Sequence, residues 1–161
     1  MKTAIFVIAG SFLLLAVVLF MRGAPEEVQD FSALSTRELA TLCDKEMAGG
    51  FHIHPTLEIV ANGERIQVPA NIGVGSTCMT VLHTHTPDGL IHVESPEKRD
   101  FTLGDFFAAW KQPFSQSEVL TYKTDVSNRI RVTVNGTEVD TFENTILGEG
   151  NKIVIYYELI N

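Results

Sequence analysis

Two Asn-Gly pairs, each between segments in which apolar and polar residues alternate, limit the folds open to this chain more than any other feature. Asn62-Gly63 and Asn135-Gly136 suit two-residue β-hairpin turns, whose central residues both need positive φ. A two-residue loop at the first pair places Ile59 opposite Ile66, so the large apolar side chains share one face. The pattern therefore predicts two antiparallel hairpins, each with one buried face.

Capping signals predict two short helices. Ser35 to Glu38 and Thr102 to Asp105 have the spacing of a capping box, and apolar residues follow each at helical intervals. We expect a helix over residues 36–48 and a short helix after Thr102, whose apolar face contains Phe106, Phe107 and Trp110. Further alternating segments predict strands over residues 51–59, 79–85, 90–95 and 152–159, while the stretch 113–128 is ambiguous, with a strand over 119–124 as one reading. The predicted fold class is α+β, a mostly antiparallel β-sheet (a small barrel or a β-grasp-like sheet) with two short helices.

A faint internal repeat links the two hairpin regions. At an offset of 73 residues, 57–82 aligns with 130–155 without gaps, and five positions are identical, including both residues of each Asn-Gly pair. Shared hairpin chemistry and duplication are both explanations of this match.

The first 22 residues form a separate segment. From Thr3 to Met21 there are 19 residues without a charge, which is long enough to cross a bilayer as a helix. We predict a signal-anchor transmembrane helix over residues 1–22, a linker over 23–34 and one extracytoplasmic (periplasmic or extracellular) domain over 35–161. The alternative is secretion after signal cleavage, although a cut after Ala24 would place Arg22 at position −3.

The charge balance excludes one class of partner. The chain has 12 Lys and Arg against 20 Asp and Glu, a formal net charge of −8. Binding to a nucleic acid backbone needs a basic face, so we expect no nucleic acid partner. The predicted partners are the membrane, through the N-terminal helix, and an envelope protein.

All five histidines lie within one stretch of 41 residues. They are His52, His54, His83, His85 and His92. Side chains at positions i and i+2 of a strand point to the same face, so each His-x-His pair presents two imidazoles together. A four-residue loop over 86–89 would place His83 directly opposite His92. The pattern predicts a face on which several imidazoles gather.

Several imidazoles on one face predict a metal site. Neutral imidazole binds Zn, Cu, Ni and Fe, and a nitrogen and oxygen donor set has its highest affinity for Cu(II). An exported compartment makes copper or zinc the expected ion. Glu58 and Glu94 share the polar positions of these strands and are predicted as oxygen ligands or as partners of the ligating rings. A hydrogen-bonded wet sheet and a pH sensor are the alternatives.

The two cysteines are predicted to form a disulfide. Alternation directs Cys78 away from the face of His83, so it does not join the metal site. In an exported protein a bond between Cys43 and Cys78 is natural, and it would stabilise the fold by about 2–4 kcal/mol. Two buried free thiols are the alternative.

Three segments resemble those of a known group of proteins. HIHPTLEIVANGERIQVPANIG, LHTHTPDGLIHVESP and FTLGDFFAAW resemble an uncharacterised family of exported bacterial and archaeal proteins with HxH, LHTH-turn-IHxES and FTLGxFF motifs. The similarity covers residues 51–110 and, more loosely, the C-terminal hairpin. That family has no established activity, so the resemblance implies only that the histidines belong together. His52, His54 and Glu58 are also similar to the first cupin metal motif, but the second cupin motif is absent.

These observations lead to one functional hypothesis and two alternatives. The first is a membrane-anchored extracytoplasmic protein that binds copper or zinc through a histidine cluster for delivery, storage or sensing, without catalysis. A histidine-ligated metalloenzyme, hydrolase or oxidoreductase, would use Glu58 or Glu94 as a base beside an open coordination position. A docking module of an envelope complex would bind no metal. No nucleophile motif, phosphate loop or His-Glu-x-x-His helix is present in the sequence, which favours binding over catalysis.

Overall fold

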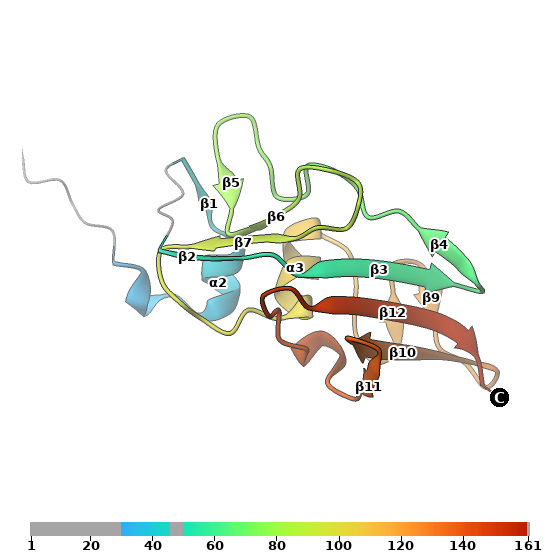
Figure 1. Cartoon of the computed structure of the whole chain (residues 1–161). Coiled ribbons are helices and arrows are strands. Elements are labelled where there is room, and N and C mark those ends of the chain that lie inside the picture. Colours follow the sequence, from blue (N-terminus) through green and yellow to red (C-terminus); the bar gives the residue numbers. More distant parts are fainter. Residues whose placement is uncertain (1–29, 46–49, 161) are drawn as a thin grey trace, which may run out of the picture. The chain divides into compact units, whose positions relative to one another are not determined.

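The computed structural model describes residues 30–45 and 50–160 (Figure 1). The predicted transmembrane helix over 1–22 lies outside the described residues, as does most of the predicted linker over 23–34. Within the described ranges, every helix is too short or too polar to span a bilayer. The account below concerns the compact unit that begins at Phe31.

A five-stranded sheet forms the larger part of this unit (Figure 1). Its strands, in spatial order, are β11 (Thr137–Val139), β10 (Asn128–Val134), β12 (Lys152–Leu159), β3 (Thr56–Ala61) and β4 (Glu64–Ile66). Both Asn-Gly pairs form the predicted hairpin turns, with Ile59 opposite Ile66 in the first hairpin. The central strands β3 and β12 run parallel, and the other neighbours are antiparallel.

The sheet is open, so the small-barrel alternative is wrong. β4 and β11 are the two edges, and each has only three residues, too few to curl round and pair with the other. A parallel central pair has an antiparallel hairpin on each side, and the grasp-like alternative stays a prediction. The α+β class with mostly antiparallel pairing is confirmed.

A three-stranded sheet, in the order β2 (Phe51–Ile53), β7 (His92–Ser95) and β6 (Leu82–His83), continues from the first. β2 and β3 are successive parts of one extended segment in Figure 1. The break between them lies at Pro55, which has no N–H to donate and whose carbonyl accepts from Ile91 N. The predicted strand over 51–59 is therefore two strands that belong to different sheets.

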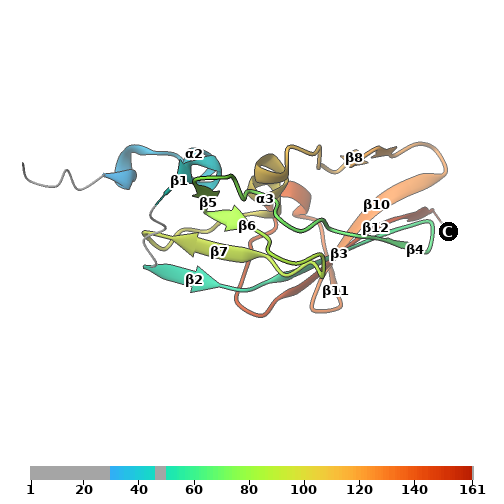
Figure 2. The ribbon, with the colours of Figure 1, turned by 90° about the horizontal axis from the view of Figure 1, so that it is seen from above.

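Two helices cover one side of the three-stranded sheet (Figure 2). They are α2 (Thr36–Thr41) and α3 (Leu103–Trp110), and both predicted capping boxes are present. α2 ends earlier than the predicted residue 48 because the chain enters β1 (Cys43–Asp44), which pairs with β5 (Met79–Thr80). The remaining short elements are η1 (Phe31–Ala33), β8 (Glu118–Val119), β9 (Tyr122–Lys123) and η2 (Phe142–Asn144).

The hydrophobic core lies between the helices and the sheets. Phe106 and Phe107 of α3 are fully buried with Leu82 and Val93 of the three-stranded sheet and with Ile91, which precedes β7. Alternation along β6 and β7 directs His83, His92 and Glu94 to the opposite side. The helices thus cover the apolar face and leave the histidine face uncovered by helix.

Candidate metal centre

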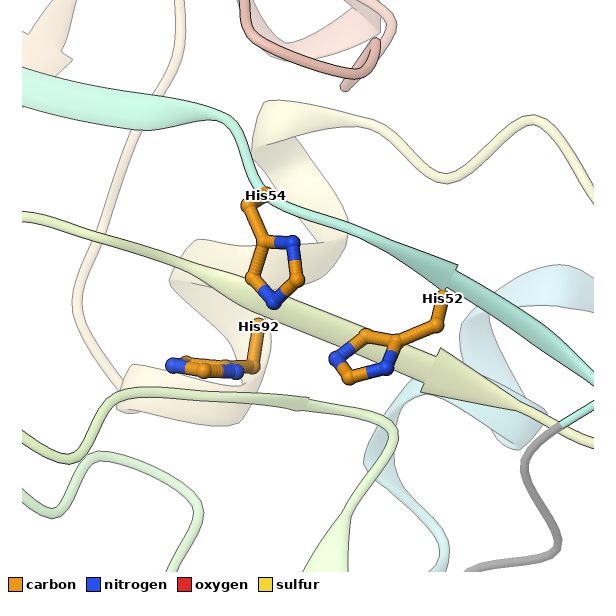
Figure 3. A group of neighbouring side chains, drawn as sticks. All are labelled: His52, His54 and His92. Carbon is orange, nitrogen blue, oxygen red and sulfur yellow. The ribbon is translucent and has the colours of Figure 1, made fainter.

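The strands place the five histidines in one cluster. β6 and β7 pair in the predicted register, with His83 directly opposite His92. β2 pairs with the other edge of β7, which puts His52 opposite Glu94. In Figure 3 the rings of His52, His54 and His92 lie in front of these strands, with α3 behind them. The central strand β7 therefore brings the two His-x-His pairs to the same face.

His92 occupies the centre of the cluster. Its ring centroid lies 6.0 Å from that of His52, 4.9 Å from His54, 5.3 Å from His83 and 4.8 Å from His85. Two groups of possible ligands have donor atoms within 4.8 Å of one another: His52, His54 and His92, and His83, His85 and His92. We call these the outer triad and the inner triad, since the side chain of His52 is 47% exposed and that of His83 is fully buried.

His83 is held in the orientation of a ligand. Its Nδ1 lies 3.0 Å from the carbonyl oxygen of Thr80. A carbonyl only accepts, so Nδ1 carries the proton and Nε2 presents its lone pair to the cluster. The sequence pattern did not indicate Thr80, because the contact is to a backbone atom and depends on the bend between β5 and β6.

The inner triad has the spacing of a coordination site. Nε2 of His83 lies 3.2 Å from Nε2 of His85. Two nitrogens bound tetrahedrally to a zinc ion at 2.0–2.1 Å would lie about 3.3 Å apart. The two rings are therefore as close as two ligands of one ion.

His92 contains a buried nitrogen that no group of the described residues satisfies. Among the described side chains, Nδ1 of His92 is buried and has no hydrogen-bond partner. Oε1 of Glu94 lies 3.6 Å from it, beyond a good hydrogen bond. Leaving such an atom unpaired costs about 1–3 kcal/mol. A bound cation would satisfy this nitrogen.

The two predicted carboxylates differ in position. Oε1 of Glu94 lies 3.0 Å from Nε2 of His52 and 3.9 Å from Nε2 of His83, so it stands between the triads. Glu58 belongs to β3, beyond the break at Pro55, and its carboxylate instead contacts Arg65 at 2.6 Å. Glu94 is the acidic group that the structure brings to the histidines.

Burial keeps the central imidazoles neutral. Desolvation is the main cause that lowers the pKa of His83, against the opposing effects of the Thr80 carbonyl and the Glu94 carboxylate. Desolvation also lowers the pKa of His92, and the neighbouring imidazoles of His85 and His54 add to this effect. Neutral imidazole is the form that binds metal.

A disulfide supports the segment that orients His83. Cys43 and Cys78 are bonded, as predicted, over a separation of 35 residues. The bond joins β1 to the residue before β5, and in the β1–β5 pair Cys43 lies opposite Thr80. The disulfide therefore anchors the strand whose Thr80 carbonyl accepts the proton of His83.

No family model, curated protein or solved structure matches this chain. The class of the protein therefore follows from the fold and the site alone. It is an α+β protein with an open mixed sheet and a cluster of five histidines and one carboxylate in which metal could be held.

Proposed function

We propose that this domain binds copper or zinc through its histidine cluster and acts as a membrane-anchored extracytoplasmic protein in delivery, storage or sensing of the metal. One observation carries the proposal. The buried Nδ1 of His92 has no hydrogen-bond partner among the described residues, in a cluster where every neighbouring ring is a possible ligand. A protein that used these rings only for its own hydrogen bonds would not need five of them around one unsatisfied nitrogen.

The donor chemistry supports copper or zinc. Both cysteines are consumed by the disulfide, so the cluster offers imidazole nitrogen and carboxylate oxygen without thiolate. Such donors suit Cu(II) and Zn(II). The disulfide also supports an oxidising compartment outside the cytoplasm, where the apolar segment over 3–21 would tether the domain beside an envelope partner.

The number of ligands favours binding over catalysis. Catalytic zinc sites combine three protein ligands with an open position for water or substrate. Here the described donors form two groups of three imidazoles that share His92, and the Glu94 carboxylate lies beside both groups, so each group has a fourth donor within reach. A cluster that can close around its ion suits storage or transfer.

Elemental analysis of the full chain in detergent tests the proposal. After loading with Cu(II) or Zn(II) and extensive dialysis, we expect the wild-type protein to retain metal at one ion per chain or more. The double variant His83→Ala/His85→Ala should retain less, while Glu58→Gln, a carboxylate change away from the cluster, should retain the wild-type amount. Absence of metal from the folded wild-type protein would overturn the proposal and leave the docking module.

A further inference from the structure

The two triads share a single residue, His92. The inner triad adds His83 and His85 from one edge of the cluster, and the outer triad adds His52 and His54 from the other. The strand order β2-β7-β6 explains this arrangement, because β7 lies between the strands that carry the two pairs. His92 is therefore the only histidine that both sets of ligands can reach.

One nitrogen of the His92 ring faces the outer pair, His52 and His54. Figure 3 shows its two nitrogens at opposite ends of the ring, with the one nearer the Cβ atom, Nδ1, on the side of His52 and His54. Each ring nitrogen has one lone pair in the ring plane, so one nitrogen cannot hold two ions in two different triads. If both triads are filled, Nδ1 and Nε2 must serve different ions.

Glu94 supplies negative charge between the triads. Its Oε1 lies within 4.0 Å of nitrogens from both sides, at 3.0 Å from His52 Nε2, 3.6 Å from His92 Nδ1 and 3.9 Å from His83 Nε2. Two divalent ions in one cluster repel each other strongly at reduced dielectric. A carboxylate between them offsets part of this repulsion.

We propose that the cluster is a dinuclear site in which an inner ion is held by His83, His85 and His92, and an outer ion by His52, His54 and His92. His92 is the shared ligand. Its neutral ring has one N–H, and binding of the second ion displaces that proton to solvent, so the ring bridges the ions as an imidazolate. Glu94 lies between the ions as their anionic partner. The inference rests on the proposed function, since it concerns how many ions the same cluster holds.

The two ions should differ in how tightly they are held. The inner triad contains the buried His83, whose Nδ1 is fixed by Thr80, so this ring is already oriented for binding. The outer triad contains His52, whose side chain is 47% exposed. The inner position should therefore fill first, and the outer ion should exchange with solvent more readily.

Stoichiometry of the full chain in detergent is the first test. Titration of wild-type protein with Cu(II), followed by elemental analysis after gel filtration, should give two ions per chain. His52→Ala/His54→Ala and His83→Ala/His85→Ala should each give one, and Glu58→Gln should keep two. One ion per wild-type chain would overturn the dinuclear site and leave the proposed function intact, whereas no metal at all would overturn both.

Electron paramagnetic resonance tests the bridge. Two Cu(II) ions joined by an imidazolate couple antiferromagnetically, so the signal per copper should fall well below that of isolated ions at low temperature. The signal should return to full intensity when one position is filled with Zn(II), and also in the single-ion variant His52→Ala/His54→Ala, whose altered side chains are the more exposed pair. Two copper ions with full, uncoupled intensity would overturn His92 as the shared ligand.

Discussion

On the outer faces of the two sheets, buried and more exposed residues alternate in the same way, but the outward side chains differ: ion pairs on one face and clustered imidazoles on the other. On β10 and β12, Arg129 and Arg131 both bond to the carboxylate of Glu158, and Arg131 also lies 4.0 Å over the ring of Tyr156. On β2, β6 and β7, imidazoles face imidazoles with one carboxylate among them. The first face pairs its charged groups with one another, and the second gathers imidazoles that could hold a metal ion.

The backbone does not cause this difference. On β7, Val93 is buried between the less buried His92 and Glu94. On β10, Ile130 is buried between the less buried Arg129 and Arg131. Both strands thus alternate in the same way and place their apolar residues in the same core. Side-chain chemistry at the outward positions therefore decides which face is structural and which can bind a ligand.

The largest effect is expected from removal of the central ring. His92→Ala takes a ligand from both triads, so we expect the affinity for Cu(II) to fall by at least about 100-fold, beyond the loss usual for a residue that only orients a ligand. Competition with a chelator of known affinity measures the change. Arg131→Ala, on the other face, should leave the Cu(II) affinity within about twofold of the wild-type value, because Arg131 has no contact with the cluster. Equal losses of Cu(II) affinity in both variants would show that the two faces do not differ in metal binding.

The second effect concerns the disulfide beside the histidine face. Cys43→Ser/Cys78→Ser should lower the free energy of unfolding by about 2–4 kcal/mol, because the open loop regains conformational freedom in the unfolded chain. It should also weaken metal binding, since the Thr80 carbonyl that orients His83 loses its anchor. Chemical denaturation and metal competition check the two results. Unchanged metal affinity in a destabilised protein would show that Thr80 keeps its place without the bond.

The two faces should lose stability in different pH ranges. In metal-free protein with chelator, burial lowers the pKa of His83 below its ordinary value of 6.5, so the unfolded chain binds protons more readily. The contribution of neutral His83 to the free energy of unfolding is complete above pH 6.5 and is lost as the pH falls below that value. On the ion-pair face, formed by Arg129, Arg131 and Glu158, hydrogen bonds from Arg131 lower the pKa of Glu158 from 4.5. The stabilisation that ionised Glu158 contributes is therefore lost only as the pH falls below 4.5.

Denaturation curves at a series of pH values, for wild type and two variants, check this order. His83→Gln should reduce the dependence just below pH 6.5, with the part due to His92 remaining, and should leave the dependence below pH 4.5 unchanged. Glu158→Gln should reduce only the dependence below pH 4.5, where carboxylates such as Asp125 contribute the rest. A loss of both dependences in one variant would show that the faces do not respond separately.

The smallest effect is expected on the ion-pair face. Arg131→Ala should lower the free energy of unfolding by only about 0.2–1 kcal/mol, since exposed ion pairs contribute little and Arg129 still contacts Glu158. Urea denaturation at low and at high salt measures it, and salt should reduce the difference. A loss of several kcal/mol would mean that this face is more than a solvated surface.

Local sequence signals predicted much of the fold. The Asn-Gly pairs, the two capping boxes and the pairing of His83 with His92 each depend on residues within one turn or one short loop. Turn chemistry and period-two alternation are local properties, so they can be read along the chain. The bond between Cys43 and Cys78 was also predictable, because two cysteines allow only one pairing.

The sequence alone thus determined that the two histidines of each His-x-His pair point the same way, because residues two apart on a strand lie on the same face of the sheet. Only the tertiary structure decided that β7 pairs with β2, which carries His52 and His54 to His92, and that the break at Pro55 takes Glu58 to another sheet. It also decided that Thr80 orients His83. Pairing between distant strands depends on how the whole core packs beneath them, and no short stretch of sequence encodes that packing.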